Sequence, residues 1–132
     1  MPEALTRNIY VAIRGICQGN PGAGAYTATI QNIDTGAEKR LQGREASTTA
    51  NRMELTAAIE GLNALRPGAV VTVIANSEYV AKGMNEWLPG WKAKGWRGPN
   101  KKPVLNADLW GKLNAAAGKH ERVRWVVGQR HC

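Results

Sequence analysis

Residues 51–75, NRMELTAAIEGLNALRPGAVVTVIA, decide the fold of this chain. Apolar side chains recur there at the i, i+3, i+4, i+7 spacing of a helix with one buried face, at Leu55, Ala58, Ile59, Leu62 and Leu65. Pro67-Gly68 ends the helix. Residues 70–75 follow as a short β-branched run, which after a helix is typical of a buried parallel strand. The stretch therefore predicts a helix that crosses over into a parallel strand.

Three strands are predicted ahead of this helix. Residues 8–16 alternate between two faces, and residues 25–30 resume the alternation after a glycine-rich turn at 19–24. A hairpin loop at 32–36 leads into a weaker strand over 37–44. The first part of the chain is therefore expected to form an antiparallel meander.

The rest of the chain predicts two more helical segments and a last strand. Residues 77–91 are helical in composition with a break near Pro89-Gly90, and residues 106–117 place Leu109, Trp110 and Leu113 on one inner face. Residues 123–127 form the last strand. The order of elements predicts an α/β fold with a five-stranded mixed sheet, three antiparallel strands and then parallel strands, flanked by helices.

Length and charge narrow the class of protein. The 132 residues suit a single domain over 1–132, with a helical insertion at about 82–102. Lys and Arg outnumber Asp and Glu by 18 to 10, in a chain that is 43% hydrophobic, which favours a globular protein with a polyanionic partner. Two cysteines do not make a disulfide framework, and no apolar run reaches the ~18 residues of a membrane span. We expect a cytoplasmic protein without a membrane partner.

The insertion mixes cations with tryptophans. One acid, Glu86, stands against six cations and three indoles: Lys82, Lys92, Lys94, Arg97, Lys101, Lys102, Trp87, Trp91 and Trp96. Cations neutralise phosphates and indole faces pack on sugars or bases, so the mixture predicts a nucleic-acid interface. The alternative is that the tryptophans belong to the core and the lysines form a solvated rim.

Six segments, in order along nearly the whole chain, resemble those of type 1 ribonuclease H. They are GICQGNPG at 15–22, TTANRMEL at 48–55, NSEYV at 76–80, WKAKGW at 91–96, KKPVLNADLW at 101–110 and, more loosely, VRW at 123–125. The resemblance implies the ribonuclease H-like fold. It also implies cleavage of the RNA strand of RNA–DNA hybrids by two divalent cations held by four carboxylates.

Three of those four carboxylates are not found in this sequence. The resemblance places the four carboxylates at positions 14, 54 and 76 and in a C-terminal helix beyond Cys132. Glu54 is present, whereas Arg14 and Asn76 stand at the other two positions, which marks the chain as a degenerate and C-terminally short member. An arginine repels a metal ion, and a neutral amide supplies no charge to hold one. We therefore expect no metal site and no cofactor. Mg²⁺ or Mn²⁺ would be needed only if the protein were an active enzyme. The main expectation is a catalytically inactive protein that binds RNA–DNA hybrid or other double-stranded nucleic acid, with Arg14 paired to Glu54.

The matching segments also imply contacts to nucleic acid. The expected nucleic-acid-binding residues are Cys17, Asn20, Thr49, Asn51, Glu78, Lys82, Trp87, Trp91, Lys92, Lys94, Trp96, Lys101, Lys102 and Asn106. For Thr49 and Asn51 the alternative is helix capping, and Asn51 with Glu54 fits a capping box. His131 falls where active members carry a mobile histidine, against the favoured alternative of an exposed terminal residue.

Two other functions stay open at this point. The first is an active, Mg²⁺-dependent RNA–DNA hybrid ribonuclease whose site is completed by another subunit. The second is an adaptor that uses the same fold to dock a protein. A homodimer or a protein partner is also expected to cover the sheet face that a C-terminal helix would otherwise cover.

Overall fold

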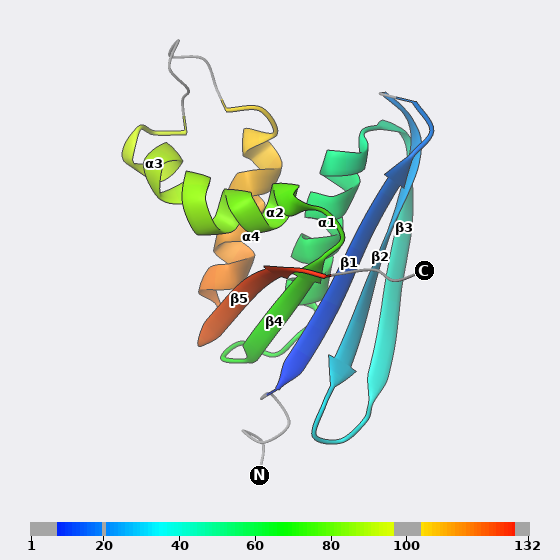
Figure 1. Cartoon of the computed structure of the whole chain (residues 1–132), viewed down its shortest axis with the longest axis vertical. Coiled ribbons are helices and arrows are strands. Elements are labelled where there is room, and N and C mark those ends of the chain that lie inside the picture. The colour runs from blue at the N-terminus through cyan, green and yellow to red at the C-terminus, as the bar shows by residue number, and fades with distance from the viewer. Residues whose placement is uncertain (1–7, 20, 97–103, 129–132) are drawn as a thin grey trace.

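The computed structural model describes residues 8–19, 21–96 and 104–128. Its elements, in chain order, are β1 (Ile9–Cys17), β2 (Gly22–Asn32), β3 (Glu38–Thr48), α1 (Ala50–Asn63), β4 (Val70–Ala75), α2 (Glu78–Lys82), a π-helix η2 (Gly83–Trp87), α3 (Leu88–Ala93), α4 (Ala107–Gly118) and β5 (Arg122–Val127). Figure 1 shows α1 and α4 stacked beside the sheet. Within these residues no helix has the length and apolar character needed to cross a membrane.

The five strands form one mixed sheet in the order β3-β2-β1-β4-β5. The pairs β1–β2 and β2–β3 are antiparallel, and the pairs β1–β4 and β4–β5 are parallel. The long crossover through α1 is what makes β1 and β4 parallel, because a tight turn can join only antiparallel neighbours. This arrangement confirms the predicted fold class.

The core lies between the sheet and the layer of α1 and α4. Ile9, Val11 and Ile13 are buried, and the residues that alternate with them along β1 are exposed. Trp110 and Leu113 of α4 have no exposed surface, which confirms the predicted inner face of that helix. One face of the sheet is therefore covered by helices and the other is open in this part of the chain.

Two strands are longer than the sequence pattern predicts. β2 begins at Gly22 and β3 continues to Thr48, because Gly22 pairs with Thr48 and Ala25 pairs with Arg44 across a register shift. Residues 44–48 carry no apolar alternation, because residues 44–47 are exposed and Thr48 is the buried residue of this segment. The pairing with β2, and not the side-chain pattern, extends this strand.

The predicted helix break at Pro89-Gly90 is wrong. The chain is helical from Glu78 to Ala93, with the wider π-turn of η2 in the middle. Pro89 lies in the first turn of α3, where a missing N–H costs little. Gly83, in η2, is packed against Trp110, and a Cβ at this position would lie 2.0 Å from the indole.

Helix α1 lies directly on β1 at Gly15. A Cβ at Gly15 would lie 2.4 Å from the amide nitrogen of Glu54 and 2.7 Å from the carbonyl oxygen of Ala50. Real Cβ atoms do not approach backbone so closely, so only glycine permits this contact. The contact places the second turn of α1 beside the end of β1.

Gly15→Ala is expected to lower the free energy of unfolding by about 1–3 kcal/mol, because α1 must move away from β1. The matched variant Gly111→Ala adds a Cβ that meets no atom within 4 Å in the middle of α4. It should raise the free energy of unfolding by up to ~1 kcal/mol through helix propensity. Urea denaturation of the two variants and the wild type measures both changes. A Gly15→Ala protein as stable as Gly111→Ala would show that the contact imposes no constraint.

Candidate active site and nucleic-acid interface

The structure brings Arg14, Glu54 and Asn76 to the same end of the sheet. Ile13 of β1 pairs with Ala75, the last residue of β4, so Arg14 of β1 lies beside the position of Asn76, which directly follows β4. Glu54 comes from the second turn of α1, which the contact at Gly15 holds beside these strand ends. The fold therefore assembles the three positions that the sequence grouped by resemblance.

Glu54 is the buried carboxylate of this site. Its side chain accepts hydrogen bonds from the backbone N–H groups of Asn76 and Ser77, both at 3.2 Å, and from the Ser77 hydroxyl at 2.7 Å. The residue is only 3% exposed. Burial raises the pKa of the Glu54 carboxyl above its ordinary value of 4.5, while the hydrogen bonds from Ser77 and Asn76 act in the opposite direction. Ser77 was not predicted, although it directly follows Asn76.

The expected ion pair between Arg14 and Glu54 is wrong. All the hydrogen bonds of Glu54 to described groups go to Asn76 and Ser77. Arg14 is exposed on the face of the sheet that points away from α1. Successive side chains of a strand point to opposite faces, so Gly15 faces α1 and Arg14 cannot. The guanidinium group is therefore left available to other anions.

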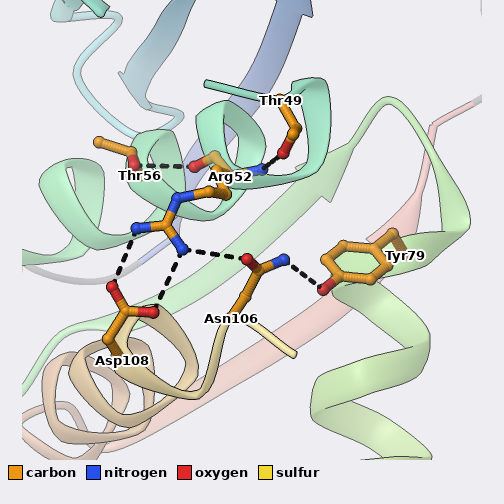
Figure 2. A network of polar contacts seen from close by, with 6 residues as sticks. All are labelled: Thr49, Arg52, Thr56, Tyr79, Asn106 and Asp108. Atoms are coloured by element: carbon orange, nitrogen blue, oxygen red, sulfur yellow. Dashed lines mark hydrogen bonds and ion pairs between the residues drawn. The ribbon is translucent and has the colours of Figure 1, made fainter. Parts of the chain in front are cut away.

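A polar network joins α1 to the start of α4 (Figure 2). The Arg52 guanidinium donates two hydrogen bonds to the Asp108 carboxylate, at 2.9 and 3.2 Å, and a third to Oδ1 of Asn106 at 3.0 Å. Nδ2 of Asn106 donates to the Tyr79 hydroxyl at 3.1 Å, and the Trp110 indole N–H donates to the same oxygen at 3.3 Å. The hydrogen bond from Arg52 is the main cause that lowers the pKa of Asp108.

This network explains the conformation of Asn106. The residue adopts a left-handed backbone with φ of 63° at the N-cap of α4, and both polar atoms of its side chain have partners. Arg52 and Asp108 are far apart in the chain and carry no local pattern, so the sequence offered no sign of their contact. Residues from α1, α2 and α4 are thereby held in one geometry.

Thr49, and not Asn51, caps α1. The Thr49 hydroxyl accepts a hydrogen bond from the Arg52 N–H at 3.2 Å. Asn51 is exposed in the first turn, and the Glu54 side chain is turned toward Ser77. The capping box expected for Asn51 and Glu54 is therefore wrong, because the helix begins earlier than the sequence pattern indicated.

The tryptophans of the insertion form a connected aromatic cluster with Tyr79 and Trp110. Ring centroids of Tyr79, Trp87, Trp91 and Trp96 are 5.8 to 6.4 Å apart along the series, and Trp91 also lies 5.3 Å from Trp110. Trp91 and Trp96 are half-buried against the core, and Trp87 is 37% exposed. Part of the indole surface thus serves packing, as the alternative interpretation held.

The other predicted contact residues are spread around this region. Lys92 and Lys94 are exposed at α3, and Lys82 lies 3.8 Å from Glu78 on α2. Cys17 donates weak hydrogen bonds to the carbonyl oxygens of Gly22 and Thr48. Asn20, Lys101, Lys102 and His131 lie outside the described residues. All the predicted nucleic-acid contacts stay predictions.

The sequence and the fold of this chain are similar to those of known ribonucleases H. The family model described as RNase H matches residues 7–131. A Ribonuclease H of Cupriavidus necator is 50% identical over 115 residues, which cover 86% of this chain and 78% of that protein. A Ribonuclease HI of Neisseria meningitidis serogroup B is 43% identical over 127 residues, 96% of this chain and 86% of that protein. A crystal structure of LC11-RNase H1 in complex with RNA/DNA hybrid superposes with a TM-score of 0.72, at 22% identity, over 93% of this chain and 86% of that one.

These similarities overturn the main functional expectation. From Arg14, Asn76 and the lack of a fourth carboxylate the protein was expected to be catalytically inactive, yet it shares half of its aligned residues with a protein named Ribonuclease H. The inference judged activity from the missing carboxylates, whereas the similarity to proteins named Ribonuclease H extends over most of the chain. The alternative, an active RNA–DNA hybrid ribonuclease with a site completed by another subunit, fits better.

The pH dependence of stability should report the burial of Glu54. Because its pKa is raised, the native state keeps a proton on Glu54 at pH values where the unfolded chain has lost it. The free energy of unfolding should therefore fall as the pH rises from about 4.5 through the raised pKa, and Glu54→Gln should lack this component. Urea denaturation across this pH range measures the difference between the two proteins. A difference that favours the wild type more at higher pH would contradict the burial effect.

The Arg52–Asp108 pair should couple more strongly than an ordinary surface pair. Its two hydrogen bonds and partial burial predict a coupling of about 1 kcal/mol in a double-mutant cycle of Arg52→Met and Asp108→Asn. The matched cycle on the exposed Glu78–Lys82 pair, at 3.8 Å, should give no more than about 0.5 kcal/mol. Urea denaturation of the four proteins in each cycle gives both values. Equal couplings would show that the network does not hold α4 to α1.

Proposed function

Because this chain belongs to the type 1 ribonuclease H family, we propose that it cleaves the RNA strand of RNA–DNA hybrids. The observation that carries the proposal is its 50% identity over 115 residues to a protein named Ribonuclease H. The position of Glu54 at the joined ends of β1 and β4 supports it, because a lone buried carboxylate at strand ends is typical of a functional site. A similar fold is described in complex with an RNA/DNA hybrid.

The proposed hybrid lies across the end of the sheet and the start of α1. Thr49 and Asn51 at the start of α1 and Asn106 at the N-cap of α4 are the proposed polar contacts to backbone phosphates and ribose hydroxyls. The insertion at about 82–102 of this proposed single domain holds the second strand through the exposed lysines of α3 and the open surface of Trp87. Lys82, Cys17 and Glu78 are proposed neighbours of the groove between the strands.

The described residues do not by themselves fit the divalent cations that this family uses. In residues 8–19, 21–96 and 104–128, no three side chains of His, Cys, Asp and Glu gather where they could hold a metal ion. The Glu54 oxygens already accept three hydrogen bonds, and Asn76 offers one neutral oxygen. Arg14 supplies no ligand oxygen, because it is a cation and faces the other side of the sheet. We therefore propose that a second subunit completes the site. In this proposal the second subunit is another copy of the chain, so the active form is a homodimer.

The residues of this chain would then bind and orient the RNA backbone. The Arg14 guanidinium presents several donors to phosphate oxygens, and no described residue competes for them. The bonds from Ser77 and Asn76 hold Glu54 in one rotamer, so the segment after β4 keeps a fixed position relative to α1. The Arg52 network keeps Asn106 at a constant position relative to α1.

A labelled RNA–DNA hybrid tests the proposal. With Mg²⁺ the protein should cut the RNA strand and leave the DNA strand intact, and a chelator should stop the reaction. Glu54→Gln should lower the rate by about 100-fold, because it removes the buried carboxylate. The matched variant Glu60→Gln, at an exposed position of the same helix, should leave the rate unchanged. Absence of any cleavage with either Mg²⁺ or Mn²⁺ would contradict the proposal.

The same assay separates the second subunit from the single chain. If a second subunit completes the site, the rate per chain should rise with protein concentration over the range in which light scattering reports a dimer. A rate per chain that stays constant in a monomeric sample would remove the second subunit from the proposal.

A further inference from the structure

Three arginines stand on the open face of the sheet, outside the predicted contact residues of the insertion. Pairing in β1, β2 and β3 places Arg14 beside Thr27, Arg40 beside Thr29, and Arg44 beside Ala25. Side chains of directly paired residues lie on the same face, so the three guanidinium groups surround a strip of small side chains on β2. We call Arg14, Arg40, Arg44 and this strip of Ala25, Thr27 and Thr29 the arginine trough.

The trough is hollowed, and its arginines are exposed in the part of the chain that the structure describes. One hollow of about 370 Å³ lies between Arg14 and Arg40, and another of about 430 Å³ lies beside Arg44. Ile16 and Ala25 line both, so the two hollows are adjacent. They arise because long arginines flank alanine and threonine. The three arginine side chains are all exposed.

The charge of the trough is not neutralised by the described part of the chain. Arg14, Arg40 and Arg44 form no ion pair and no side-chain hydrogen bond with a described residue. The acids of β3 are Glu38, which lies on the same face as Arg40 two residues along the strand but forms no ion pair with it, and Glu45, which alternation turns to the other face. Three like charges on one surface repel each other, and a bound polyanion relieves that repulsion. The ligand that fits is therefore a chain of phosphates or carboxylates.

The shape and position of the trough favour nucleic acid in single-stranded form. A flat sheet touches a convex duplex along little of its surface, whereas a single strand can lie along it and stack its bases. Tyr10 and Ile16 on the same face are 40% and 53% exposed and provide apolar surface for bases. Arg14 also lies beside Asn76, so a strand in the trough is continuous with the candidate active site.

We propose that the arginine trough binds the backbone of a single nucleic-acid strand that extends from the hybrid. That the strand extends from a hybrid rests on the proposed function, whereas the binding of phosphates by the trough does not. Arg40 and Arg44 are about 14 Å apart along β3, and Arg14 lies two strands away, at about 10 Å. Cations at these spacings contact a strand over several nucleotides. Neither Arg40 nor Arg44 belongs to the candidate active site.

Binding of a labelled single-stranded oligodeoxythymidine, followed by fluorescence anisotropy in the presence of chelator, tests the trough. Arg40→Gln/Arg44→Gln should weaken binding about 10-fold at low salt. It should also reduce the slope of log affinity against log salt by about 1.4, since each phosphate contact on a single strand contributes about 0.7. The matched control Arg66→Gln/Lys112→Gln removes the same charge at exposed positions away from the trough and should bind like the wild type. Circular dichroism checks that both variants are folded.

Several outcomes would overturn the inference. Equal loss of binding in the two double variants would mean that only net charge matters. A blunt duplex that competes as well as the single strand would exclude single-strand recognition, and polyglutamate that binds more tightly than the oligonucleotide would identify an acidic protein as the partner. Cleavage of a blunt hybrid by the same proteins is measured in parallel. Intact cleavage with unchanged oligonucleotide binding in Arg40→Gln/Arg44→Gln refutes the trough alone, whereas trough-dependent binding without any cleavage refutes only the proposed function.

Discussion

The contact between α1 and β1 at Gly15 is the constraint on which the candidate site depends. Backbone of the helix lies where any side chain at position 15 would stand. The helix therefore places Glu54 beside the end of β4, where the N–H groups of Asn76 and Ser77 donate hydrogen bonds to its carboxylate. Without that close approach the carboxylate would be too far from β4 to be buried, and α1 would lose its hydrogen bonds to the segment that follows β4.

Strand alternation then separates the charges of this region onto two sides of the sheet. Glu54 is buried on the helix side, whereas Arg14 is exposed on the open side. Because the Arg14 side chain is exposed, its charge is not buried, and it needs no ion-pair partner inside the protein. The same alternation aligns Arg14 with the arginines of β3, which makes the open face basic and continuous with the site.

A second set of contacts connects the helical layer to this site. Arg52 of α1 holds Asp108 and Asn106 at the start of α4, and Asn106 holds the hydroxyl of Tyr79. Tyr79 in turn packs against Trp87 and Trp110. The aromatic cluster of the insertion is thus attached to the helix that carries Glu54, so the two proposed nucleic-acid contacts keep a fixed relative position.

The fold could be predicted from local patterns, because apolar periodicity in residues 51–75 and strand alternation in β1 follow directly from side-chain burial. Resemblance located Arg14, Glu54 and Asn76 but led to a wrong conclusion about activity, which similarity over most of the chain corrected. Only the tertiary structure decided that Arg14 does not reach Glu54, that Ser77 does, and that Arg52 and Asp108 meet. Those outcomes depend on strand register and helix approach, which arise from packing between segments far apart in the chain and leave no local pattern.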